Sequence, residues 1–176
     1  MINDSLNDYI GQLQLLSFFS GYPLVYALVN FAVAERRKKL PYFSKRWIEL
    51  LPFAYALVGT LFFGFLLKNI SPDFSLKHIS DLFQSSYLEV WGIMSILFWI
   101  PMISKKTVFS LLHSLPFFFL LVKDFFMQTT FNSARLVIGN DMKMYTISIV
   151  LNAGALVIVF VIFFLLRHFV FDKTLP

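Results

Sequence analysis

Apolar residues dominate five stretches of the chain, and short polar stretches separate them. A helix needs about 17–25 such residues to cross the hydrocarbon core of a bilayer. The pattern predicts transmembrane helices over residues 12–34, 48–67, 87–103, 107–128 and 144–166, of which 87–103 is the shortest. We therefore expect an all-α, polytopic integral membrane helical bundle of about five spans, with residues 1–176 forming a single membrane domain.

The polar stretches predict the connections between these spans. They cover residues 35–47, 68–86 and 129–143, and the last contains the turn signal Gly139-Asn140-Asp141. Within 68–86, Ser71-Pro72-Asp73 is a typical helix start, and apolar residues follow it at helical spacing. We expect a short amphipathic helix there, lying at the membrane interface. The alternative is a lid over a central cavity.

Two further features predict how the spans pack. Ser104-Lys105-Lys106 leaves room only for a tight turn, so the third and fourth spans must be antiparallel neighbours. Small residues at four-residue spacing lie on one helix face and allow a second helix to approach closely. Such faces are formed by Ser17 and Gly21 in the first span, where Pro23 is expected to bend the helix, and by Pro52, Ala56, Thr60 and Gly64 in the second.

Composition supports the membrane interpretation. The chain is 58% hydrophobic and only 14% charged, whereas soluble domains are about a quarter charged. The polar residues are too few to cover the surface of a soluble protein, so we expect lipid to surround the apolar side chains. Cysteine is absent, which excludes disulfides and thiol chemistry. The high content of Phe and Lys is typical of an AT-rich genome and favours a bacterial cytoplasmic (inner) membrane.

Positive charge predicts the orientation. Cytoplasmic loops carry an excess of Lys and Arg, and with the N-terminus outside and the C-terminus inside, most of the fifteen basic residues lie on the cytoplasmic side. The stretch 35–47 would anchor this topology. It could also bind anionic lipid headgroups or an acidic partner, but it carries no specific nucleic-acid motif. Its basic residues are Arg36, Arg37, Lys38, Lys39, Lys45 and Arg46.

Polar side chains inside the spans are the candidates for chemistry, because such groups are costly in lipid. Their simplest role is hydrogen bonding between helices. A functional role would be a polar track that passes protons or ions. The candidate track consists of Ser110, His113, Ser114 and Asp124 in the fourth span, with Ser148 and Asn152 in the fifth.

Three classes of function follow. We expect a non-catalytic membrane component that oligomerises or serves as an accessory or regulatory part of a larger system, for example a bacterial defence system. The alternative is a small ion or proton channel or carrier that uses the fourth span. An intramembrane enzyme is the remotest of the three, because the sequence contains no nucleophile motif, phosphate loop, metal-ligand set or cofactor motif. We expect no metal and no cofactor, and as partners the bilayer and a second copy or another protein.

Overall fold

The computed structural model of the chain describes residues 11, 13–36, 41–70, 87–130 and 135–171, and every regular element in this part is helical. Residues 13–19 form a first helical segment. The elements that follow are α2 (Tyr22–Arg36), α3 (Pro41–Ile70), α5 (Tyr87–Ile93), the 3₁₀ helix η1 (Met94–Trp99), α6 (Pro101–Ser104), α7 (Thr107–Thr130) and α8 (Arg135–Phe171).

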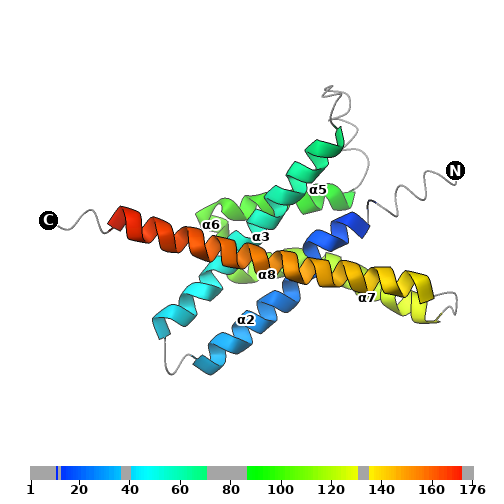
Figure 1. Ribbon diagram of the computed structural model, residues 1–176, viewed down its shortest axis with the longest axis horizontal. Coiled ribbons are helices and arrows are strands. Elements are labelled where there is room, and N and C mark those ends of the chain that lie inside the picture. The colour runs from blue at the N-terminus through cyan, green and yellow to red at the C-terminus, as the bar shows by residue number, and fades with distance from the viewer. Residues whose placement is uncertain (1–10, 12, 37–40, 71–86, 131–134, 172–176) are drawn as a thin grey trace.

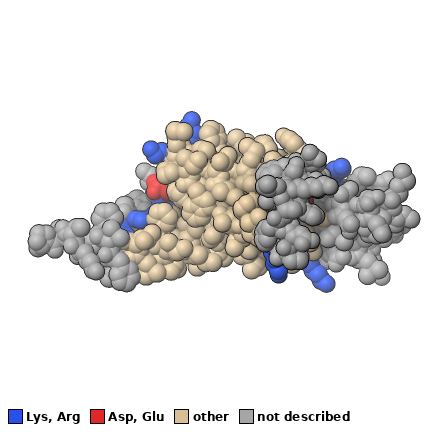
Figure 2. Space-filling view, turned by 90° about the horizontal axis from the view of Figure 1, so that it is seen from above, with Lys and Arg blue, Asp and Glu red and all other residues tan. Residues whose placement is uncertain are grey.

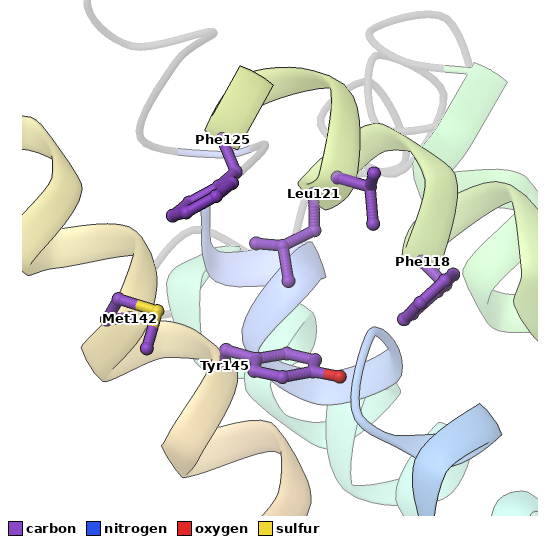
Figure 3. A pocket seen from close by; sticks show the side chains of 6 residues that line it. Phe118, Leu121, Phe125, Met142 and Tyr145 are labelled. Carbon is purple, nitrogen blue, oxygen red and sulfur yellow. The ribbon is translucent and has the colours of Figure 1, made fainter. Parts of the chain in front are cut away.

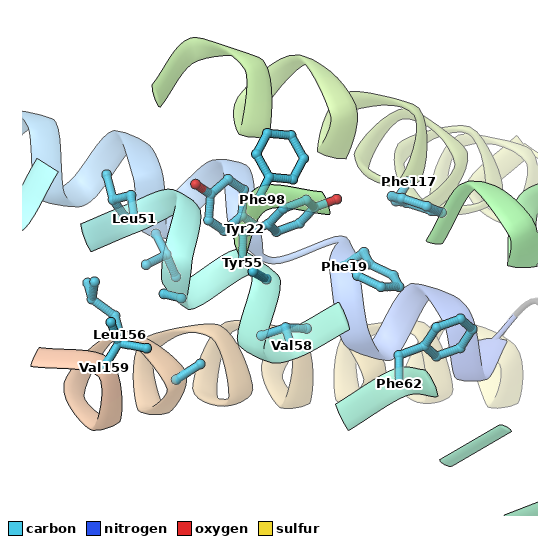
Figure 4. Close-up of a cluster of buried hydrophobic side chains, with 14 of the residues drawn as sticks. Phe19, Tyr22, Leu51, Tyr55, Val58, Phe62, Phe98, Phe117, Leu156 and Val159 are labelled. Carbon is cyan, nitrogen blue, oxygen red and sulfur yellow. The ribbon is translucent and has the colours of Figure 1, made fainter. Parts of the chain in front are cut away.

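Helix α3 is the centre of the bundle. It packs against α8 and η1 most extensively, and also against α2, α5 and α7. Figure 1 shows α8 along the longest axis of the molecule, crossing α2 and α3, which lie side by side. The core between them is built from aromatic and aliphatic side chains, and Figure 4 shows it around Phe19, Tyr22, Tyr55, Phe62 and Phe117.

Within the described residues, three helical stretches are long and apolar enough to cross a membrane: Leu13–Glu35, Arg46–Lys68 and Met142–Arg167. Tyr87–Trp99 and Thr107–Lys123 are shorter apolar helices. In Figure 2, Lys and Arg side chains lie on either side of a central tan surface that carries neither sign of charge. The fold is therefore all-α, as predicted, and has the make-up of an integral membrane protein.

The first span is interrupted, whereas Pro23 was expected only to bend it, and the break lies just before the proline. Ser20 and Gly21 form a turn between the first helical segment and α2. Pro23 has no N–H, so it cannot donate to the carbonyl of Phe19 as an ordinary residue would. The proline instead occupies the second position of α2, where a missing N–H costs nothing.

The third span is not the single helix expected over 87–103. It is divided into α5, η1 and α6. The residue before a proline is disfavoured in helical conformation, and Ile100, which precedes Pro101, is extended with φ −74° and ψ 118°. Pro101 then starts α6 at its first position. The predicted tight turn follows, and Trp91 and Phe98 both contact His113 of α7, so the two segments lie side by side.

Two predicted connections are shorter than expected. Residues 41–47 belong to α3, because Pro41 is a favourable first residue of a helix. Residues 135–143, with the turn signal at Gly139, belong to α8, which also continues past Arg167 to Phe171. Interior glycine costs a helix only about 1 kcal/mol, so a long apolar helix can absorb it. The amphipathic helix expected within 68–86 lies outside the described residues.

Candidate functional site

His113 lies in a cage of aromatic rings contributed by four elements. Its ring stacks on Trp91 of α5, with centroids 4.7 Å apart and planes 5° from parallel. The edges of Tyr55 of α3 and Phe98 of η1 approach it at centroid distances of 5.6 and 5.7 Å, and Phe117 lies one turn further along α7 at 6.3 Å. The Trp91 indole N–H donates to the carbonyl of His113 at 3.1 Å, which fixes α5 against α7.

The imidazole is hydrogen-bonded on one side only. Its Nδ1 lies 2.8 Å from the hydroxyl of Tyr55, whereas Nε2 is buried and has no partner in the described part of the chain. If the phenol donates to Nδ1, the ring proton lies on Nε2, and if Nδ1 donates, Nε2 is a bare acceptor. In both tautomers one polar atom is buried unsatisfied, which is unusual in a folded protein.

A second hydrogen bond joins α7 to α2 close by. The hydroxyl of Tyr22 lies 2.7 Å from that of Ser110, and Ser110 donates to the carbonyl of Thr107 at 2.7 Å. Since the proton of Ser110 is used there, Tyr22 is the donor of the pair. The rings of Tyr22 and Tyr55 are 4.4 Å apart, so the two tyrosine–α7 hydrogen bonds form one cluster.

Ser148 and Asn152 of α8 lie instead at the break in the first span. The N–H of Gly21 donates to the hydroxyl oxygen of Ser148 at 2.8 Å. The Asn152 side-chain NH₂ donates to the carbonyls of Phe18 and Ser148, both at 2.8 Å. Its Oδ1 is buried without a partner in the part of the chain that the structure describes. Ser148 and Asn152 of α8 thus hydrogen-bond to backbone groups that lack their helical partners at the break.

The six residues of the predicted polar track therefore fall into separate groups. Ser110 and His113 join the tyrosine cluster, Ser114 is buried and donates to the carbonyl of Leu111 in its own helix at 2.8 Å, and Ser148 and Asn152 hold the break. Among the described residues no hydrogen bond links these groups. Asp124 lies in α7, with a side chain outside the described part.

The predicted packing residues have different surroundings. Gly21 touches the backbone of α8: a Cβ there would lie 2.5 Å from the nitrogen of Ile149. Ser17 donates to the carbonyl of Gln14 at 2.6 Å. On the predicted packing face of the second span, Pro52 and Ala56 are buried. Thr60 is exposed, and its hydroxyl accepts from the indole of Trp99 at 2.9 Å. Gly64 faces open space.

The basic stretch is described only in part. Arg36 ends α2, and Lys45 and Arg46 lie in α3. Arg46 is half-buried and takes part in an interaction. Arg37, Lys38 and Lys39 lie outside the described residues, as do the side chains of Arg36 and Lys45. A role in binding lipid headgroups or an acidic partner stays a prediction.

The tyrosines and Trp91 are the site residues that the sequence interpretation missed. Trp91 lies near one end of the third span, where amphipathic rings commonly mark the membrane interface. The available signal was the position of Tyr22 and Tyr55 well inside their apolar spans. A phenol so placed needs a hydrogen-bond partner, and the polar residues of the fourth span are natural partners.

An apolar pocket of about 210 Å³ lies between α7 and α8 (Figure 3). Its lining consists of Phe118, Leu121, Val122, Phe125, Met142 and Tyr145. This space is apolar and contains none of the polar residues of the two sites above. In the described ranges no three His, Cys, Asp or Glu side chains gather closely enough to hold a metal ion.

Comparison with known proteins yields no match to a protein family, a curated protein or a solved structure.

Replacing Tyr55 by phenylalanine should destabilise the protein by about 0.6–2 kcal/mol, because both nitrogens of His113 would then be buried without a partner. Unfolding in mixed micelles measures the change. Tyr87→Phe is the control, since Tyr87 is 79% exposed. A double-mutant cycle with His113→Phe should show that the two effects are not additive. Equal losses for the two tyrosines would contradict the proposed pairing.

Proposed function

We propose that the protein is a non-catalytic integral membrane component that acts by lateral association with a second copy of itself. It would span the membrane about five times, with the N-terminus outside and the C-terminus inside. The support for association comes from one exposed face of α8. That helix is the most apolar of the candidate spans and the least buried inside the bundle.

The exposed face of α8 carries a seven-residue repeat. Its positions alternate at spacings of three and four residues, which is the seam of a left-handed pair of helices. All of them are exposed. The seam consists of Ile147, Val150, Gly154, Val157, Val161 and Phe164.

Gly154 marks the middle of this seam. A Cβ at this position would meet nothing within 4 Å, so the glycine is not required by packing within the described chain. A glycine lowers helix stability relative to alanine by about 0.5–1 kcal/mol, and in membranes small residues let two backbones approach. Two copies inserted in the same orientation would bring their α8 helices together in parallel, with Gly154 near Gly154 across a two-fold axis.

Cysteine crosslinking tests the association, because the chain contains no cysteine of its own. Single cysteines at Val150 and Val157 should form disulfide-linked dimers on mild oxidation in the membrane, since seam side chains come within disulfide reach. Leu28→Cys in α2 is the control, at a side chain that is 62% exposed, as Val150 is at 65%. Adding Gly154→Ile to Val157→Cys should remove the dimer band. Equal crosslinking at all three positions would indicate random collision.

The packing around His113 and the separation of the polar groups give less support to the channel or carrier alternative. The four rings that enclose His113 would have to move before an ion could pass its imidazole. Within the described residues the polar side chains of α7 and α8 form separate groups. A pore between several copies would need a polar face, whereas the seam of α8 is apolar.

A further inference from the structure

The break in the first span leaves carbonyl oxygens without their usual helical donors. In a continuous helix the carbonyl of Ser17 would accept from Gly21, but that N–H donates to Ser148 instead. The carbonyl of Phe19 would accept from residue 23, which is a proline without an N–H. These carbonyls lie at the C-terminal end of a half-helix, where the backbone carries partial negative charge.

Asn152 adds a further oxygen to this end. The side chain is 1% exposed, and its NH₂ group lies 2.8 Å from two carbonyl oxygens, those of Phe18 and Ser148. A carbonyl cannot donate, so these contacts settle which end of the amide is nitrogen. The buried Oδ1 is then an acceptor without a donor in the described part of the chain, and leaving it so costs about 1–3 kcal/mol.

Oxygen acceptors therefore outnumber donors at the break. No described lysine or arginine is buried, so the described chain brings no cation of its own to this place. Divalent cations prefer carboxylate ligands, and no aspartate or glutamate is among the buried side chains in the described ranges. Neutral oxygens at an interrupted membrane helix instead suit a monovalent cation of the sodium type, which unwound carbonyls and half-helix ends coordinate in membrane transporters.

We propose that the break at Ser20–Gly21 binds a sodium-like monovalent cation, held by Asn152 Oδ1 and carbonyl oxygens of the first helical segment. The Gly21 N–H already donates to the hydroxyl oxygen of Ser148, so it does not supply the donor that these oxygens lack. A bound cation would link α8 to both halves of the first span. This site does not depend on the seam of α8 and would exist in a single copy.

Thermal unfolding of the purified protein in detergent tests this site. Sodium chloride should raise the unfolding midpoint by about 5 °C over choline chloride of equal ionic strength. Asn152→Leu should abolish the difference. Asn30→Leu should keep the difference, because in the described part of the chain Asn30 donates within its own helix, to the carbonyl of Tyr26.

Two results would overturn the site: equal midpoints in the two salts, or a sodium-dependent rise that Asn152→Leu retains. Equal midpoints would indicate that an ordered water molecule, and not a cation, is the partner of Asn152 Oδ1. If Asn152→Leu does not fold, binding of radioactive sodium to the unchanged protein decides. Retention of an ion that excess unlabelled sodium displaces supports the site, and no retention overturns it.

Discussion

Replacing Gly21 by alanine should separate the first span from α8 and destabilise the protein by about 3 kcal/mol. The added Cβ would lie 2.5 Å from the nitrogen of Ile149 and 2.6 Å from the carbonyl carbon of Ser148. Both are backbone atoms, so no side chain can rotate away. The helices must move apart, and the 2.8 Å hydrogen bond from the Gly21 N–H to Ser148 would lengthen or break.

Gly64→Ala is the matched control for this prediction. It makes the same chemical change in an apolar helix, but a Cβ at Gly64 would meet nothing within 4 Å. We expect it to be neutral or to stabilise by up to about 1 kcal/mol, because alanine favours helix over glycine. Unfolding of both variants in mixed micelles gives the comparison. Similar losses at the two glycines would mean that the contact between the break and α8 is looser than the structure shows.

Replacing Phe19 by alanine should cost about 3 kcal/mol or more, because the ring is the hub of the buried aromatic cluster. Phe19 is fully buried. It stacks on Phe117 at 4.9 Å and meets Phe62 and Tyr55 edge to face at 5.3 and 5.7 Å (Figure 4). In a membrane the side chains of the unfolded chain remain in lipid. The destabilisation therefore comes from lost packing contacts and from the cavity that the missing ring leaves in the core.

The control for Phe19→Ala is Phe31→Ala in the same span. Phe31 is 72% exposed, so its removal should change stability by less than about 0.5 kcal/mol. The melting temperatures of the two variants in detergent provide the measurement. The loss at Phe19 should also lower the protection of α7 from hydrogen exchange, because Phe117 loses its stacking partner. If Phe31→Ala cost as much, the aromatic cluster would not be the main source of stability.

Predictions made along the chain were correct where local chemistry decides the outcome. Apolar runs became helices, the first span changes course close to Pro23, and Ser104-Lys105-Lys106 formed a tight turn. At Gly21 the first span lies against the backbone of α8, where a Cβ would come 2.5 Å from the nitrogen of Ile149. The expectation of a single helix over 87–103 was wrong, although Pro101 was a local signal for the break.

Predictions of helix ends and partners were less successful. Residues 41–47 and 135–143 looked like connections because they are polar, but a helix can extend through polar residues outside the apolar span. The face from Pro52 to Gly64 looked uniform, yet its first half is buried and Gly64 is open. His113 and Asn152 share polarity but not a location, and no spacing along the chain tells which helix each one meets.

The sequence by itself determined that this chain is a bundle of apolar helices, because hydropathy and segment length depend only on neighbouring residues. Proline alone did not determine where those helices break, because Pro52 and Pro116 lie inside the continuous helices α3 and α7. Only the tertiary structure decided that Ser148 and Asn152 hold the broken first span and that Tyr55 and Trp91 enclose His113. Such pairings depend on how helices distant in sequence are placed against each other, and a uniformly apolar surface permits many placements. A few buried hydrogen bonds and the absence of a side chain at Gly21 select one of them.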